Sequence, residues 1–161
     1  MSNSISINGT APTPYIGQPT EGDGYMIVAR ELLQGVEALS TLPNISPRAA
    51  ALIAAHALEC ALKAFLWHKG ITAIRNNETQ HNLVALWGMA YNQLLSIPQE
   101  PPDWCKILGS GHGPNFYFRY QEGVRNGKQK TIVHSGQTPA LIPMVTELRK
   151  LIEMVALAVN G

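Results

Sequence analysis

The sequence predicts an all-α protein, an up-and-down bundle of four long helices and one short helix, with a small β-hairpin inserted before the last helix. Three observations support this fold class. Apolar residues recur at helical spacing along most of the chain, the predicted helices are bounded by capping residues or prolines, and residues 116–134 have the composition of two short strands. A chain of 161 residues is long enough for one domain with its own core.

The chain divides into a tail, residues 1–24, and a single domain, residues 25–161. The tail is rich in Ser, Asn, Gly, Pro and Thr and is expected to be disordered. It has neither the basic start nor the apolar core of a signal peptide. The two cysteines, Cys60 and Cys105, do not resemble a disulfide framework, so we expect reduced thiols and a cytoplasmic protein. Polar residues within the most apolar stretch argue against a membrane span.

The first two helices follow from spacing and capping. Residues 25–42 repeat apolar side chains at helical intervals, Asp23 is a candidate cap, and Pro43 ends the run. Ser46 followed by Pro47 is a strong start signal for a second helix. That helix is predicted to reach Lys69, with Gly70 just beyond its end.

The later elements are marked by turn residues. Thr79 is expected to cap a third helix over residues 81–96, and a short helix is expected over 103–108. Residues 116–120 and 128–134 are the two predicted strands, and Asn126-Gly127 between them favours a tight hairpin turn. The last helix is expected over residues 138–159, with Pro143 in its first turns.

The second helix carries three titratable side chains, His56, Glu59 and Lys63, in its otherwise apolar sequence. At about 100° per residue these positions fall on one face, so they form a single polar stripe. One interpretation is an ion pair between Glu59 and Lys63 at the edge of the bundle, beside an ordinary half-buried histidine. The alternative is that the stripe faces inward and meets a polar partner.

The stretch around this stripe resembles the HEPN family of small helical domains. The motifs that carry the resemblance are Glu59, then Leu62-Lys63 one turn later, Gly70 closing the helix, and His81-Asn82-Leu83 opening the next. A Trp-bearing short helix followed by Arg119-Tyr120 is also similar to a variant of the family. The resemblance covers roughly residues 25–160 and implies a hydrogen bond between Glu59 and His81 across the bundle.

Catalytic members of the HEPN family are metal-independent endoribonucleases with an Arg and a His four to six residues apart, usually completed by dimerisation. Arg75 and His81, with five residues between them, are the matching pair in this sequence. Arginine can stabilise charge on a phosphate, and histidine can transfer protons near neutral pH. The pair precedes the third helix, whereas the family carries its motif in a later helix.

A second polar group, Arg119, Tyr120 and Arg125, combines guanidinium groups with a flat ring. Such a combination can hold a phosphate and stack a base, so these are the candidate ligand-binding residues. The alternative is a strand in which Phe116 and Phe118 face the core and Arg119 faces the solvent.

Other chemistries are not predicted. Residues 109–115 are glycine-rich but lack the Gly-Lys-Ser/Thr ending of a phosphate-binding loop, and His112 is interpreted as a loop histidine. His56, Glu59 and Cys60 share a helix, but Cys60 points away from the stripe and no second pair of ligands is apparent. We therefore expect neither a metal nor a cofactor.

The charge content of the sequence limits the kinds of partner that the protein is expected to bind. The net charge of +1 argues against a strong electrostatic footprint for nucleic acid, and only 14% of residues are charged, which favours a surface partly covered in a homodimer. We expect a HEPN-like module that binds RNA, a nucleotide or a cognate protein in a defence or toxin–antitoxin setting, as the resemblance implies. The alternatives are an endoribonuclease using Arg75 and His81, and a purely structural homodimeric subunit.

Overall fold

The computed structural model describes residues 20–74, 79–113, 118–119 and 138–161, and these ranges hold five helices and no strand. The predicted all-helical bundle is confirmed. The numbers of long and short helices differ from the prediction of four long helices and one short one, because two of the five helices have ten residues each. The helices are α1 (Glu21–Ser40), α2 (Pro47–His68), α3 (Leu83–Asn92), α4 (Asp103–His112) and α5 (Leu141–Asn160).

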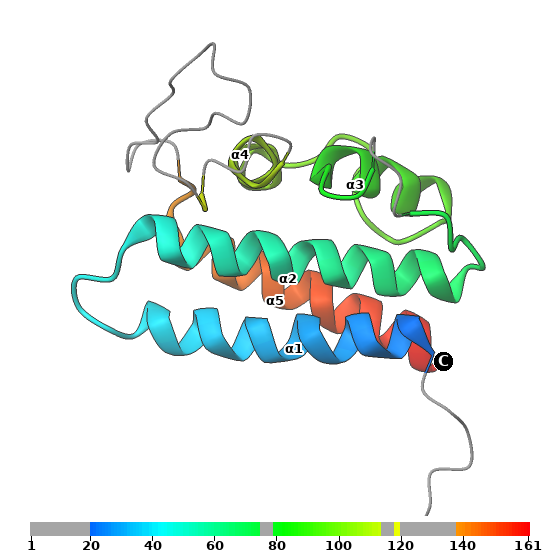
Figure 1. Ribbon diagram of the computed structural model, residues 1–161, viewed down its shortest axis with the longest axis horizontal. Helices are drawn as coiled ribbons and strands as arrows, with labels where there is room; N and C mark the ends of the chain where they lie inside the picture. The colour runs from blue at the N-terminus through cyan, green and yellow to red at the C-terminus, as the bar shows by residue number, and fades with distance from the viewer. Residues whose placement is uncertain (1–19, 75–78, 114–117, 120–137) are drawn as a thin grey trace, which may run out of the picture.

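The helices form two groups on opposite sides of α2 (Figure 1). Helices α1 and α5 run beside α2 on one side, and the shorter α3 and α4 cover it on the other. As a result α2 packs against all four other helices. A helix buried on every side must be apolar on every side, which explains the composition that the sequence displays there.

Helix α2 fits this central position because it is built largely from alanine and leucine. By length and composition it is the one helix in the described ranges that would be able to cross a membrane, with a mean hydropathy of 1.6, and 78% of that stretch is buried inside the protein. Such burial is typical of the core helix of a soluble protein. On α1, a Cβ atom at Gly22 would lie 2.5 Å from the Trp67 ring, so glycine permits the close approach of these two helices.

The first two helices begin largely as the sequence predicts. Helix α1 starts at Glu21, so the predicted tail extends too far, and Thr20 is its cap, with Asp23 completing the capping box. Ser46 caps α2 by accepting a hydrogen bond from the backbone N–H of Ala49. Gly70 follows the helix with a φ of 79°, the left-handed conformation predicted for it.

The third helix is shorter than predicted. Asn82, rather than Thr79, caps it, and the helix ends at Asn92 instead of residue 96. Leu94 then adopts a φ of 66° while its side chain is 91% exposed. The left-handed conformation is costly for a leucine, so a leucine at this position is not a recognisable signal that the helix ends.

The last two helices have bounds that differ from the predicted ones. Helix α4 continues to His112, beyond the predicted residue 108, and α5 begins at Leu141, which leaves Pro143 in its first turn, where proline is tolerated. The predicted β-hairpin lies outside the described residues except for Phe118 and Arg119. These two residues lie in a turn, and no strand occurs in the part of the chain that the structure describes.

Candidate functional site

The carboxylate of Glu59 lies at the centre of the polar stripe and is buried, with 3% of the residue exposed. It accepts a hydrogen bond of 2.5 Å from Lys63 Nζ, one turn further along α2. Lys63 is equally buried, and its ammonium group also lies 5.6 Å from the centre of the Tyr25 ring on α1. The interpretation of this pair as an exposed ion pair at the bundle edge is therefore wrong, and the stripe faces inward.

Two imidazoles approach the other oxygen of Glu59. Nδ1 of His81, just before α3, donates to Oε2 at 3.1 Å, and Nε2 of His112, the last residue of α4, donates to the same oxygen. The expected hydrogen bond between Glu59 and His81 is confirmed. The two rings lie edge to face, with their centroids 5.7 Å apart. The carboxylate thus joins α2 to α3 and α4.

These three donors keep the carboxylate ionised. Burial alone would raise the pKa of Glu59, but the hydrogen bonds from His112, Lys63 and His81 outweigh burial and lower the pKa from 4.5 to about 2. A buried carboxylate without partners would cost several kcal/mol or take up a proton. The carboxylate of Glu59 is therefore ionised, and its hydrogen-bonding capacity is used within the protein.

His56, one turn before Glu59, is half-buried and is the least constrained member of the cluster. Its Nε2 lies 4.0 Å from Cys60 Sγ, and its ring centroid lies 6.2 Å from that of His112. Burial lowers the pKa of His56, and the basic side chains of His112, Arg119 and Lys63 lower it further against the opposing effect of Glu59. These surroundings favour the neutral form of the imidazole. Burial raises the pKa of Cys60 to about 12, so its thiol is not a nucleophile.

Arg119 is held beside this cluster by its neighbour in sequence. Phe118 is buried, and its backbone N–H donates to the carbonyl of Gly111 at 3.0 Å. A Cβ atom at Gly111 would lie only 2.2 Å from the Phe118 ring, so glycine is needed for the ring to lie against α4. Arg119 itself is exposed, and its charge lowers the pKa of His56. The expectation of Phe118 in the core and Arg119 at the surface holds, although in a turn rather than a strand.

The remaining candidate residues lie outside the described ranges. Arg75, the predicted catalytic partner of His81, is among them, as are Tyr120 and Arg125 of the predicted ligand-binding group. Within the described residues, the structure brings together His56, Glu59, Lys63 and His81 and sets Arg119 beside them.

The residue that sequence reasoning missed is His112. Its place in a glycine-rich stretch predicts a loop histidine, but His112 ends α4 and is 1% exposed. The buried residues of α4 recur at helical spacing, at Cys105, Leu108, Gly111 and His112, and this spacing is the sequence signal that the helix extends to His112. With His112 in place, one donor atom each from His56, Glu59 and His112 lies within 4.8 Å of the others.

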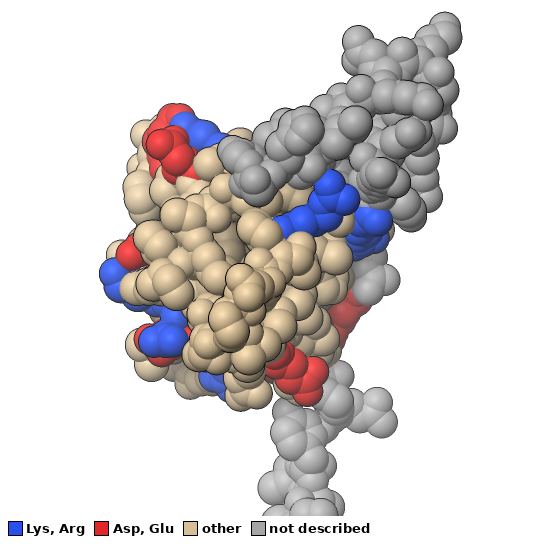
Figure 2. All heavy atoms as spheres, turned by 90° about the vertical axis from the view of Figure 1, so that its left-hand side faces the viewer, with Lys and Arg blue, Asp and Glu red and all other residues tan. Residues whose placement is uncertain are grey.

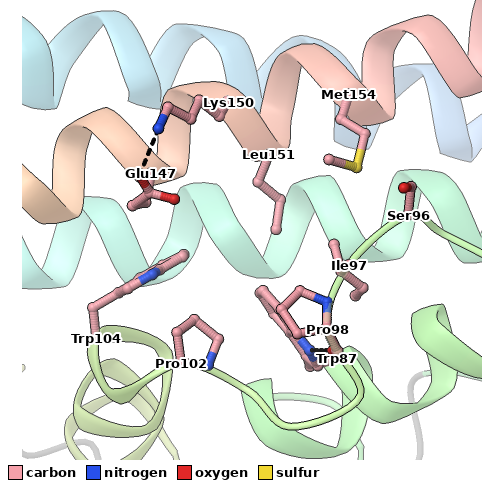
Figure 3. Close-up of a pocket in the computed structure, with 10 residues that line it drawn as sticks. All are labelled: Trp87, Ser96, Ile97, Pro98, Pro102, Trp104, Glu147, Lys150, Leu151 and Met154. Carbon is pink, nitrogen blue, oxygen red and sulfur yellow. Dashed lines mark hydrogen bonds and ion pairs between the residues drawn. The ribbon is translucent and has the colours of Figure 1, made fainter.

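A pocket lies between the α3–α4 connection and α5 (Figure 3). This pocket has a volume of about 380 Å³, and its walls are mainly apolar. Trp87 and Trp104 meet edge to face there, with centroids 6.2 Å apart, and Trp87 Nε1 donates to the carbonyl of Pro98. At its rim, Lys150 Nζ donates to Glu147 at 2.8 Å. The other lining residues are Ser96, Ile97, Pro102, Leu151 and Met154.

Charged side chains are sparse on the described part of the surface that Figure 2 shows. Figure 2 views the left-hand end of Figure 1, and most of the coloured surface there is uncharged, with basic and acidic side chains in small separate groups. Comparison with protein-family models, with curated proteins and with solved structures found no match.

Proposed function

We propose that the protein is a HEPN-like module that binds a phosphate group of RNA or of a nucleotide beside the Glu59 cluster, without strong catalysis. The observation that carries the proposal is the position of Arg119, which is exposed and fixed next to a half-buried imidazole by the burial of Phe118. The family assignment is supported by the contacts among Glu59, Lys63 and His81, the residues on which the resemblance depends.

The chemistry of this position suits an anion. The carboxylate of Glu59 is paired with Lys63, and Arg119 places a guanidinium group at the exposed side of the cluster. A guanidinium group binds phosphate oxygens through two parallel hydrogen bonds, and a neutral imidazole beside it can donate a third. Among the described residues at this end of the molecule, Figure 2 shows basic side chains only in small groups, so we expect few phosphate contacts from them and a weak dependence of affinity on salt.

A catalytic alternative uses Arg75 and His81 as a metal-independent endoribonuclease. One observation favours it: the His81 side chain keeps 27% of its surface exposed while Nδ1 contacts Glu59. An ionised carboxylate that accepts a hydrogen bond from one ring nitrogen orients the imidazole and leaves the other nitrogen available for proton transfer.

We also propose that the protein forms a homodimer through the pocket of Figure 3, in the defence or toxin–antitoxin setting that the resemblance implies. Leu94 projects 91% exposed two positions before Ser96 at the pocket wall, and Leu157, 77% exposed, follows Met154 by one turn of α5. Exposed apolar side chains around an apolar pocket are typical of an interaction surface. A second copy would supply a Leu94 side chain to this pocket.

The phosphate-binding proposal is tested by fluorescence anisotropy with a labelled single-stranded RNA and a labelled nucleotide, both in EDTA. Arg119→Ala should weaken binding at least fivefold, whereas Arg30→Ala, an exposed arginine on α1, should leave it unchanged. Equal losses in both variants, or no binding by the unmodified protein, would contradict the proposal. Cleavage of the RNA in EDTA that is lost in His81→Gln, a substitution that retains a donor for Glu59, would favour the endoribonuclease instead.

A further inference from the structure

Three side chains of the cluster are typical ligands of transition metals. His56 and Glu59 lie three positions apart on α2, a spacing that places both on one face of the helix. His112 arrives from α4, and one donor atom from each of the three residues lies within 4.8 Å of the other two. Ligands of one tetrahedral ion are separated by roughly 3.3 Å when the bonds are about 2 Å long, so small side-chain rotations would suffice.

The histidines also have unused lone pairs. Nδ1 of His56 and Nδ1 of His112 are buried and have no hydrogen-bond partner among the described residues. Buried polar atoms without partners are rare in folded proteins, and an ion bound by His56 would give the unpartnered nitrogen of that residue a ligand role. His56 is only half-buried, so an ion would have a route to it from the solvent.

We propose that His56, Glu59 and His112 bind a divalent transition-metal ion of the Zn²⁺ type. Two imidazoles and one carboxylate are ligands that suit Zn²⁺, Co²⁺ and Ni²⁺, whereas Ca²⁺ and Mg²⁺ require oxygen ligands. Three protein ligands leave a fourth position for water or another small ligand. This site goes beyond the proposed phosphate binding, which does not require a metal.

The residues next to these three ligands would orient the Glu59 carboxylate and affect the affinity for the ion. Lys63 contacts Oε1 of Glu59, so Oε2 is the oxygen that would bind the metal. Nε2 of His112 now donates a hydrogen bond to Oε2, and the ion would replace the proton of that hydrogen bond. His81, with Nδ1 3.1 Å from Oε2, would orient the carboxylate. Hydrogen-bonded ligands of this kind are usual in metal sites. The positive charge of Lys63 opposes the ion and limits its affinity.

The test exploits the isolation of His56. Its side chain has no hydrogen bond to the Glu59 network, so His56→Ala should preserve the fold, which circular dichroism checks. The matched control is His68→Ala, an exposed histidine at the end of the same helix. Protein freed of metal with EDTA and then dialysed is titrated with Zn²⁺ by calorimetry and with Co²⁺ by visible absorption.

We expect one Zn²⁺ per chain and the intense visible bands of four-coordinate Co²⁺. His56→Ala should weaken Zn²⁺ binding at least tenfold and abolish the Co²⁺ bands, and His68→Ala should change neither. No saturable binding, or affinity that His56→Ala leaves unaltered, would overturn the proposal. Because the RNA measurements are made in EDTA, a failure here is distinguishable from a failure of phosphate binding.

Discussion

The imidazole of His112 donates a hydrogen bond to the carboxylate of Glu59, although the two residues lie 53 positions apart in the sequence. Both side chains are buried, and the contact ties the end of α4 to the middle of the central helix. The position of α4 fixes Phe118 and Arg119 in turn, through the contact of Phe118 with Gly111. A buried polar pair therefore determines the geometry of the exposed candidate site.

Removing the charge of Glu59 should destabilise the protein strongly. Glu59→Gln leaves the buried ammonium of Lys63 without its counter-ion, and we expect a loss of about 3–5 kcal/mol in the free energy of unfolding. Urea denaturation measures this loss. Glu153→Gln, at an exposed position on α5, is the control and should change stability by less than about 0.5 kcal/mol. Similar stabilities for the two variants would mean that Glu59 is not a buried charge.

The lowered pKa of Glu59 predicts a particular response to acid. Since the pKa is about 2 in the folded protein and 4.5 without these contacts, the stabilisation is complete above pH 4.5 and is lost as the pH falls towards 2. The difference corresponds to a loss on the order of 3 kcal/mol. Urea denaturation in EDTA between pH 6 and 2 should show this decline, and a much shallower one in Glu59→Gln. Parallel curves for the two proteins would contradict the assignment.

Two glycine-to-alanine substitutions should have opposite effects. Gly111→Ala places a methyl group against the Phe118 ring and should cost about 1–3 kcal/mol, as overpacking does. Gly88→Ala, inside α3 with open space around it, should instead stabilise the protein by about 0.5–1 kcal/mol. Thermal unfolding compares them. Fluorescence anisotropy should also show that Gly111→Ala binds RNA more weakly, because Arg119 is displaced. Unchanged stability and unchanged RNA affinity in Gly111→Ala would contradict the packing of the Phe118 ring against Gly111.

A substitution at Leu94 tests whether the protein forms the proposed homodimer. Asparagine tolerates the left-handed conformation better than leucine, so Leu94→Asn should stabilise the isolated chain by about 1 kcal/mol while removing the apolar contact between copies. Light scattering after size exclusion should find a dimer for the unmodified protein and a monomer for Leu94→Asn. Leu42→Asn, at an exposed leucine in the α1–α2 connection, should remain dimeric. A monomeric unmodified protein would end the proposal.

The sequence predicted what depends on local pattern. The bounds of α2 followed from Ser46, Pro47 and Gly70, and the spacing of Glu59 and Lys63 placed them on one face. The contact with His81 came from the resemblance. The role of His112 was not predictable in this way, because helix capping and periodicity describe neighbours in sequence and not a contact across 53 positions. The end of α3 was missed since leucine at position 94 is not a typical helix terminator.

The most direct test of the Glu59 network is the tautomeric state of its two histidines. Long-range ¹H–¹⁵N correlation spectra of histidine-labelled protein, recorded at pH 7 in EDTA, identify which ring nitrogen carries the proton. We expect protons on Nδ1 of His81 and on Nε2 of His112, because each donates to Glu59. An unprotonated Nδ1 in His81, or an unprotonated Nε2 in His112, would contradict this expectation.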